Sequence, residues 1–264
     1  MKICNLLEYM KRRFENKVIL VTGSSCGIGR TTAKRFAEEG GTLIVHGPED
    51  SSDLLDAFTE IKEISPGSLK VACELSDSNS IRQMFELIQS EFARVDIVVN
   101  NAAAQNSISF LELTEEDWDY VMAVNLKAPF LICQLAARMM KDQGGGKIVN
   151  IGSVHEYQTK RHFIHYSTAK GGLVMLTKNM ALELADYNIQ VNQVAPGAIV
   201  TRLTDEKRQK QFLTAVPAQR VGTTDEIASM VLFLASSEAD YITGVSMTVD
   251  GGLTLGFCAS RPDL

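Results

Sequence analysis

The sequence is poor in the features that mark secreted, metal-binding and nucleic-acid-binding proteins. Its five cysteines are odd in number, scattered along the chain and never spaced as CxxC. Disulfide frameworks and zinc sites need paired or clustered cysteines, so neither they nor any metal site are expected, and a reducing cytoplasm fits best. The formal net charge of −6 argues against a nucleic-acid partner, which requires a basic patch.

Long apolar runs are also missing. No stretch of eighteen consecutive apolar residues occurs, so no membrane partner is expected. The first ten residues lack a small-residue cleavage site, and polar residues interrupt their apolar stretch, which does not fit a signal peptide. Because the periodic pattern begins near Phe14, residues 1–13 are predicted to be an N-terminal extension, with Met10 as an alternative start. Residues 14–264 are predicted to form one domain.

Short apolar runs alternate with amphipathic stretches along nearly the whole chain. The apolar runs predict strands at Lys17–Thr22, Thr42–His46, Leu69–Cys73, Val95–Asn100, Lys147–Ile151, Ile189–Val194 and Ser246–Val249. The amphipathic stretches predict helices at Ile28–Glu39, Asp53–Ile64, Asn79–Phe92, Glu115–Lys141, His165–Ala185 and Thr224–Ala235. This alternation is typical of an α/β fold with a Rossmann-type, doubly wound parallel sheet of about seven strands. Its ligand crevice lies at the carboxyl ends of the strands.

The polar segment at 202–216 has a helical pattern and follows Pro196-Gly197. It is predicted to be a lid-like insertion over the site. The helices predicted at Glu115–Lys141 and His165–Ala185 are apolar on more than one side, which indicates burial on both flanks. A matching helix of a second subunit would supply the second flank.

A glycine-rich segment, Thr22 to Gly29, follows the first predicted strand and opens the first predicted helix. In this context Gly23 permits a tight turn, Gly27 lets the backbone approach a pyrophosphate, and Gly29 allows close helix packing. The amides and the dipole at the helix start then attract phosphate groups. The segment predicts a dinucleotide site, with a glycine-rich turn that binds no ligand as the alternative.

Tyr166 and Lys170 are four residues apart on a predicted helix and therefore share one face. An ammonium beside a phenol lowers the phenol's pKa from about 10, which makes the tyrosine a proton donor or acceptor near neutrality. Ser153 lies thirteen residues before the tyrosine, and Asn125 lies further upstream. Together with the phosphate loop, these residues predict a hydride-transfer site.

The motifs and their order resemble those of the short-chain dehydrogenase/reductase family. The resemblance runs from residue 14 to residue 252 and rests on Thr22–Gly29 (TGxxxGIG), Asn100-Asn101-Ala102, Asn125-Leu126, Ser153, Tyr166xxxLys170, and Pro196-Gly197 with Thr201. It implies an NAD(P)-dependent oxidoreductase that interconverts a secondary alcohol or sugar hemiacetal with its carbonyl. It also implies a homotetramer.

The resemblance implies a role for each catalytic residue. Tyr166 is the acid/base acting on the substrate oxygen, and Ser153 hydrogen-bonds that oxygen and orients it. Lys170 lowers the tyrosine pKa and binds the ribose hydroxyls of the nicotinamide half. Asn125 holds a water that links Lys170 to a proton relay, with a locally satisfied helix asparagine as the alternative.

The resemblance also implies which residues bind the cofactor. They are Thr22, Gly23, Ser25, Gly27, Ile28, Gly29, Glu74, Leu75, Asn101, Ala102, Tyr166, Lys170, Pro196, Gly197, Ile199 and Thr201. Two positions depart from the family pattern. Ala103 stands where a glycine is usual, and Glu74 stands where an aspartate usually meets the adenine.

The choice of nucleotide is predicted from segment 46–50, which reads His-Gly-Pro-Glu-Asp. NAD-selective members of the family usually carry Asp at position 47. NADP-selective members usually carry Arg at position 48 or a basic residue at position 26. This chain has Gly47, Pro48 and Cys26, and Arg30 is the one obvious cation. A 2′-phosphate would face the two acidic residues of the segment, which favours NAD over NADP.

Within the family, several segments are similar to the glucose 1-dehydrogenase branch: Ser153-Val154-His155-Glu156, His165-Tyr166, Pro196 to Ile199, and Asp250 to Leu255. The similarity implies a substrate site made of Gln105, Ser153, His155 and Tyr166. His155 is expected either to meet a sugar hydroxyl or to lie on a surface loop. Gln105 replaces a carboxylate of that branch, so the substrate stays open.

Two other functions are alternatives. The core motifs also fit a 3-oxoacyl-thioester reductase. A nucleotide-sensing or scaffold protein that keeps the fold without turnover is the alternative from another class, and the presence of both Tyr166 and Lys170 argues against it.

Overall fold

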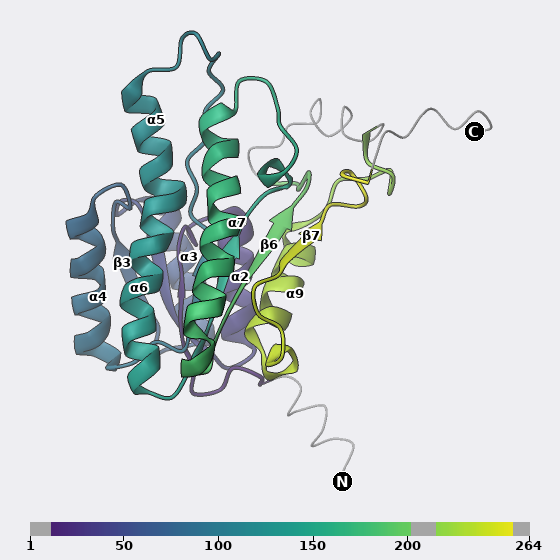
Figure 1. Ribbon diagram of the computed structural model, residues 1–264. Coiled ribbons are helices and arrows are strands. Elements are labelled where there is room, and N and C mark those ends of the chain that lie inside the picture. The colour runs from purple at the N-terminus through teal and green to yellow at the C-terminus, as the bar shows by residue number, and fades with distance from the viewer. Residues whose placement is uncertain (1–11, 202–214, 256–264) are drawn as a thin grey trace.

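The computed structural model describes residues 12–201 and 215–255. At its centre is one parallel sheet of seven strands in the order β3-β2-β1-β4-β5-β6-β7 (Figure 1). The strands are β1 (Val18–Val21), β2 (Thr42–Gly47), β3 (Leu69–Ala72), β4 (Ile97–Asn100), β5 (Gly146–Ile151), β6 (Ile189–Pro196) and β7 (Ser246–Val249). The predicted Rossmann-type sheet is confirmed.

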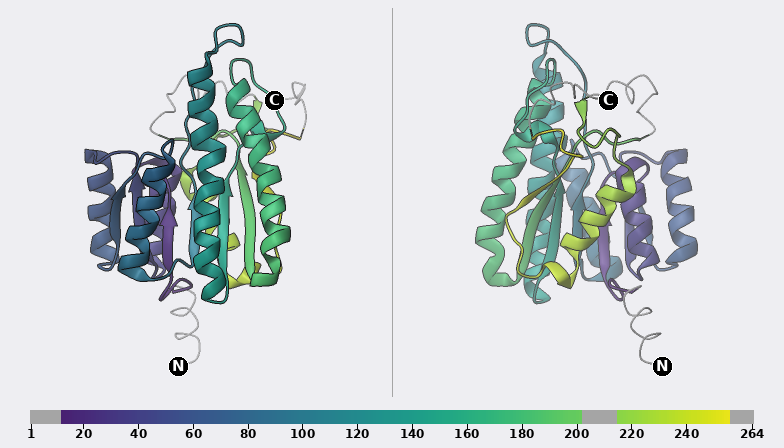
Figure 2. Two further views of the ribbon diagram at one scale, coloured as in Figure 1. Left: turned by 60° about the vertical axis from the view of Figure 1, so that its left-hand side comes forward. Right: turned by 90° about the vertical axis from the view of Figure 1, so that its right-hand side faces the viewer.

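Helices cover both faces of the sheet (Figure 2). One face carries α4 (Ser78–Phe92), α6 (Ala128–Asp142) and α7 (Ile164–Leu184), and the other carries α2 (Gly27–Glu38), α3 (Ser52–Ile64) and α9 (Thr224–Ala235). Three of these helices start on the side-chain caps Ser51, Asp77 and Thr223, each worth about 1 kcal/mol.

The near-continuous apolar runs of the strands follow from burial on both faces. Alternate residues of a strand point to opposite sides, so each strand supplies two separate cores. In β1, Val18 and Leu20 belong to the core beneath α4 and α6, whereas Ile19 and Val21 belong to the core beneath α2 and α9. A sheet exposed on one face would alternate apolar with polar residues instead.

The helix predicted over Glu115–Lys141 is present as one continuous helix, Glu115–Asp142, with a π-helical turn inside it. Its parts are α5 (Glu115–Met122), the π-helical turn η1 (Ala123–Lys127) and α6. Pro129 in the first turn of α6 has no N–H to donate to the carbonyl four residues earlier, which belongs to Asn125. Proline therefore frees a backbone acceptor where the helix widens.

The α5–α6 stretch is long and apolar enough, by composition alone, to cross a membrane. Here it is a core helix: 56% of its most apolar window is buried inside the protein. Ile132, Cys133, Ala136 and Met140 are fully buried against the sheet and α4.

The start of the described chain is fixed to the sheet's lower edge. Phe14 is buried and packs edge-on against Phe36 of α2, with ring centroids 4.6 Å apart. The Arg13 guanidinium binds the Glu39 carboxylate through two nitrogens, at 2.6 and 2.9 Å. Most of the predicted lid, residues 202–214, lies outside the described residues.

The order of the strands creates a crevice between β1 and β4. From β1 the chain proceeds towards β2 on one side, whereas from β4 it proceeds towards β5 on the other. Parallel sheets bind ligands at such a switch point, outside the carboxyl ends of the strands. The loops after β1, β4, β5 and β6, which carry most of the predicted site residues, all leave from this edge, where α5 and the start of α7 extend past the strands (Figures 1 and 2).

Candidate active site

The glycine-rich loop after β1 has the geometry of a phosphate loop. Gly23 and Gly27 adopt φ of +63° and +57°, which side chains disfavour. A Cβ on Gly29 would lie 2.2 Å from the Gly23 carbonyl oxygen, so only glycine lets α2 start this close to the strand. Ser25 and Ile28 lie half-buried in the same loop. The first amides of α2 therefore face the crevice as an anion site.

Thr22 and Asn101 join this loop to the end of β4. The Thr22 hydroxyl Oγ1 accepts from the backbone N–H groups of Asn101 and Ala102, at 3.0 and 3.1 Å. The Asn101 amide Nδ2 donates to the carbonyls of Thr22 and Gly23, at 2.9 and 3.0 Å. Both side chains are thus engaged in holding the two loops together. By holding the loops together, they fix the shape of the crevice.

His46 is part of this framework, and its role was missed in the sequence. It is 1% exposed at the end of β2. Its ring Nδ1 accepts from the Gly23 N–H at 3.0 Å, so the hydrogen must sit on Nε2, which donates to the Cys73 carbonyl at 2.9 Å. Burial lowers the pKa of His46 to about 4. A neutral imidazole therefore ties the phosphate loop to the chain after β3.

The buried His46 predicts a pH-dependent stability. Its folded pKa of about 4 lies below the ordinary 6.5, so the contribution of the neutral ring is complete above pH 6.5 and is lost as the pH falls towards 4. The loss amounts to about 3 kcal/mol. Urea unfolding of wild type and His46→Gln between pH 7 and 4 should show that the variant has the shallower slope. The exposed His162→Gln serves as control, and equal slopes in wild type and His46→Gln would contradict the assignment.

Ser153, Tyr166 and Lys170 meet at the carboxyl ends of β5 and β6. Ser153 follows β5 and caps the short helix η2 (Val154–Glu156), while Tyr166 and Lys170 lie on one face of α7. The Ser153 hydroxyl lies close enough to the Tyr166 phenol to lower its pKa. The Lys170 ammonium Nζ donates to the Ile151 carbonyl at 2.7 Å and lies 5.6 Å from the centroid of the Tyr166 ring. All three side chains are buried, with at most 8% of each exposed.

The ionisation of this group differs from the sequence prediction. Burial raises the pKa of Tyr166 above its ordinary value, the Ser153 hydroxyl lowers it, and the charge of Glu156 raises it. Burial also lowers the pKa of Lys170 to about 8, against the opposing charge of Glu156. The pKa of Tyr166 is therefore raised and not lowered as predicted, because desolvation disfavours phenolate and ammonium alike.

Asn125 is fully buried in the π-helical turn, and its side chain is satisfied by one neighbour. Its Oδ1 accepts from the Ala104 N–H at 2.9 Å, and its Nδ2 donates to the Ala104 carbonyl at 2.7 Å. The side chain thus pins the loop after β4. This is the locally satisfied arrangement that the sequence left as the alternative.

The predicted substrate residue Gln105 lies on this pinned loop and is exposed. Next to it, Asn106 bonds through Oδ1 to His165 Nε2 and donates from Nδ2 to Asp117 of α5 at 2.9 Å. His165 is fully buried beside Tyr166, so Asn106 fixes the loop against the start of α7. No motif or spacing in the sequence predicted these contacts.

His155, the second predicted substrate residue, lies against the tyrosine. Its ring contacts the Tyr166 ring edge-on, with centroids 6.2 Å apart. Its Nδ1 donates to the Gln158 carbonyl at 3.0 Å, so Nε2 is left as an acceptor. That nitrogen has no hydrogen-bond partner within residues 12–201 and 215–255.

The remaining predicted cofactor residues surround the same crevice. Pro196 ends β6, and a Cβ on Gly197 would lie 2.6 Å from the Asp250 side chain, so the chain passes β7 closely. Ile199 pairs with Gly222, and the Thr201 methyl would lie 3.8 Å from a Cβ on Gly27. Thr201 therefore lies next to Gly27 of the phosphate loop.

Glu74 and Leu75 follow β3. Leu75 is buried, and the Glu74 carboxylate accepts from the Ser76 N–H at 2.9 Å. Glu74 thus closes a local turn in the position where the family usually has an aspartate.

The cations near the second strand are already paired. Arg30 binds the Glu60 carboxylate of α3 through Nε at 3.0 Å and through a terminal nitrogen at 2.9 Å. Lys34 binds the same carboxylate at 2.7 Å, and Lys70 binds Asp50. A 2′-phosphate at this end of the crevice would have to compete with Glu60 for Arg30.

The fold and this constellation define an oxidoreductase that uses a dinucleotide. A model of the family described as enoyl-(acyl carrier protein) reductase matches residues 23–254. The 3-oxoacyl-[acyl-carrier-protein] reductase FabG of Thermotoga maritima is 38% identical over 247 residues, which cover 92% of this chain and 100% of the relative. Glucose 1-dehydrogenase 2 of Bacillus subtilis is 35% identical over 254 residues, covering 93% and 98%. The crystal structure of acetoin dehydrogenase from Enterobacter cloacae is 40% identical, with a TM-score of 0.85 and coverage of 93% and 98%.

The chain belongs to the short-chain dehydrogenase/reductase family. It is an oxidoreductase that acts on CH–OH groups with NAD or NADP. The names of the relatives span three substrate types at similar identity, so the comparisons leave the branch within the family open.

Proposed function

We propose that Tyr166, Ser153 and Lys170 carry the chemistry. Once the Tyr166–Lys170 pair has lost a proton, Tyr166 would accept the hydroxyl proton of the alcohol and Ser153 would orient the alcohol oxygen. A bound nicotinamide would supply the acceptor for the hydride. The Lys170 ammonium binds the ribose hydroxyls. The carbonyl of Asn125, freed by Pro129, holds the relay water, because the Asn125 side chain is engaged by Ala104.

We propose that the substrate is a small hydroxyl-rich alcohol, of the sugar hemiacetal or polyol kind, as in a glucose 1-dehydrogenase. The observation that carries this proposal is His155, whose Nε2 is an acceptor beside the tyrosine ring. A second hydroxyl next to the reacting one would donate to this nitrogen. The exposed amide of Gln105, on the loop opposite, offers a further donor and acceptor.

A 3-oxoacyl-thioester reductase is the second candidate, and one feature favours it. Phe110 and Leu111, on the loop between β4 and α5, are 72% and 93% exposed. An acyl chain or a carrier protein would cover such apolar side chains. The FabG relative has a name of this kind.

A panel of substrates discriminates between the two candidates. We expect oxidation of sugars, polyols or vicinal diols to give a kcat/KM at least tenfold above that for reduction of acetoacetyl thioesters. His155→Leu should raise KM for the hydroxyl-rich substrate about tenfold, the scale of one lost hydrogen bond, with little change for a simple secondary alcohol. A thioester as best substrate would overturn the sugar proposal in favour of the second candidate.

NAD is the proposed cofactor, because Glu60 occupies Arg30 and the segment after β2 offers only acidic residues. Wild type should therefore prefer NAD in kcat/KM. Glu60→Gln should release Arg30 and improve NADP use several-fold, the scale of one exposed charge contact. Glu63→Gln, on the exposed side of the same helix, is the matched control. Strong NADP preference in wild type would refute this proposal.

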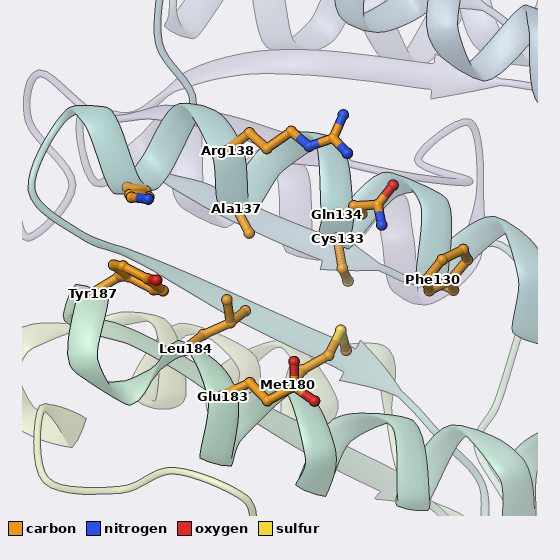
Figure 3. A pocket seen from close by; sticks show the side chains of 10 residues that line it. Phe130, Cys133, Gln134, Ala137, Arg138, Met180, Glu183, Leu184 and Tyr187 are labelled. Carbon is orange, nitrogen blue, oxygen red and sulfur yellow. The ribbon is translucent and has the colours of Figure 1, made fainter.

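A homotetramer in the cytoplasm is the proposed assembly and location. Figure 3 shows Phe130 and Cys133 of α6 facing Met180 and Leu184 of α7 across an apolar groove of ≈ 280 Å³. Also on α7, Met175 and Leu182 are 56% and 80% exposed. Matching helices of a second subunit would cover this surface, as the apolar pattern of both helices predicted. A monomer by light scattering at micromolar concentration would exclude it.

A further inference from the structure

Glu156, the last residue of η2, is a half-buried carboxylate that the chemistry proposed above does not use. It lies three residues after Ser153 and forms a capping box with it, since the Ser153 N–H donates to Glu156 Oε2 at 3.4 Å. The Ser246 hydroxyl on β7 donates to its Oε1 at 2.6 Å, and the Gln193 amide on β6 donates to its Oε2 at 2.6 Å. Three donors from three elements thus converge on one carboxylate.

The donor from Gln193 ends a longer chain of side chains through the sheet. Asn100 donates to Asn150 at 2.8 Å, Asn150 donates to Thr177 of α7 at 2.8 Å, and Thr177 donates to Gln193 at 3.2 Å. These four side chains are at most 3% exposed. Every N–H or O–H in the chain points towards Glu156. Hydrogen bonds aligned in one direction polarise one another, and this alignment suits a negative charge at the end.

The packing around this series of hydrogen-bonded side chains is tight at Gly152. A Cβ on Gly152 would lie 2.5 Å from both Gln193 Nε2 and Glu156 Oε2. Glycine at this position therefore lets the carboxylate and the amide close over the backbone between β5 and Ser153. The contact places the Glu156 carboxylate next to the backbone that precedes Ser153.

We propose that Glu156 is a positioning residue that fixes Ser153 through the capping box and supplies the counter-charge of Lys170. The proposal rests on the roles of Ser153, Tyr166 and Lys170 proposed above. Glu156 does not reach the substrate, and it acts through these neighbours.

The electrostatics agree with this geometry. Burial raises the pKa of Glu156, whereas the hydrogen bonds from Ser246, Ser153 and Gln193 and the charge of Lys170 lower it. In return, the charge of Glu156 raises the pKa of both Tyr166 and Lys170. The other titratable groups around Tyr166 and Lys170 are His155 on η2, His165 on α7 and Asp117 on α5. Asp117 is engaged by Asn106, and its charge acts on His165.

The test is the pH profile of Glu156→Gln, which keeps the shape of the side chain and removes its charge. Both Lys170 and Tyr166 should then lose their protons at lower pH. We expect the rising limb of oxidative kcat/KM to move down by about one pH unit, the scale of a nearby charge. A purely structural role would lower the height of the profile and leave its position unchanged. Glu156→Asp, which keeps the charge, should restore the position while kcat stays reduced.

A matched control comes from another capping box in the described part of the chain. Glu226 caps α9 with Thr223 as Glu156 caps η2 with Ser153, but it is exposed and pairs with Arg220. Glu226→Gln should leave the position of the profile unchanged. If Glu156→Gln does not fold, Ser246→Ala takes its place. It removes one donor from the carboxylate and should move the profile the same way by a smaller step.

Binding of NADH, followed by its fluorescence between pH 6 and 9.5, gives a readout that needs no alcohol. In wild type the affinity should fall as the pH rises through about 8, where Lys170 loses its charge. In Glu156→Gln the fall should begin about one unit lower. If the proposed substrate class is wrong, the kinetic arm changes substrate while the binding arm still reports on Glu156. Unmoved curves for folded Glu156→Gln, or for Ser246→Ala in its place, would overturn the proposal.

Discussion

Tyr166→Phe is expected to reduce kcat by about 10²- to 10⁴-fold, the usual contribution of an acid or base in the transition state. The substitution removes the transferable proton and little else. The ring keeps its edge-on contacts with His155 and Phe163, at centroid distances of 6.2 and 6.1 Å. Ser153 loses its phenolic neighbour, at a cost of about 1 kcal/mol in stability. The dissociation constant for NADH should therefore stay within about threefold of wild type, because binding of NADH does not involve transfer of the tyrosine proton.

Steady-state kinetics and NADH fluorescence measure the two halves of this prediction. Tyr157→Phe is the matched control, because it removes the hydroxyl of an exposed tyrosine, which is hydrogen-bonded to Thr248 at 2.6 Å, just after η2. It should keep nearly full activity. If Tyr166→Phe retains more than a tenth of the wild-type rate, another group is the acid/base.

The sheet could be predicted closely because its signal is local and repeated. Each strand is rich in apolar residues, and β1 is an unbroken apolar run. Burial on both faces is the physical cause of such runs. The strands begin and end within two residues of their predicted bounds. The order of the motifs then placed Thr22, Ser153 and Gly197 at the same edge, as the structure has them.

Other features had no local signal. The π-helical turn within the long helix lies next to Pro129, and apolar periodicity does not record such a turn. His46 reads as one more residue of a buried strand, and its function appears only when Gly23 and Cys73 approach it from other loops. Glu156 did carry a signal, because serine followed by glutamate three residues later is the pattern of a capping box.

The ionisation of the site was misread for a related reason. The spacing of Tyr166 and Lys170 reveals their shared face, but not how much water the fold removes from both. Desolvation disfavours both charged forms, so it raises the pKa of the phenol and lowers that of the ammonium. Sequence spacing predicted the partner correctly and the net direction incorrectly.

Lys170→Ala is therefore expected to have the largest effect on the pH profile. The fully protonated pair is phenol beside ammonium. After the loss of one proton it is either phenolate beside ammonium or phenol beside neutral amine, and these two forms contain the same number of protons. The pair therefore gives up its first proton in one shared step. The pKa of about 8 at Lys170 locates this step. Oxidation needs the pair with that proton removed, and reduction needs it present. In wild type the oxidative kcat/KM should rise with pH through about 8, and the reductive kcat/KM should fall through the same value.

Without the lysine, only the buried phenol remains to be titrated. Its pKa is raised above the ordinary value of about 10, so the oxidative limb of Lys170→Ala should move from about 8 to above 10. At pH 8 this corresponds to a loss of about fiftyfold or more in kcat/KM, because half of the wild type is in the active form there and each unit of pKa removes tenfold of that form. Binding of NADH should weaken as well, since the ribose loses its cation.

Lys178→Ala is the matched control, because Lys178 lies two turns further along α7 and is exposed. Its profile should coincide with that of wild type. Lys170→Arg separates charge from shape: a guanidinium stays charged throughout the accessible pH range and cannot share the proton. Its oxidative limb should therefore report the phenol beside a permanent cation and lie below that of Lys170→Ala. If the limb of folded Lys170→Ala stays near pH 8, the proton removed in that step does not come from the Tyr166–Lys170 pair, and the two residues share a helix face without sharing a function.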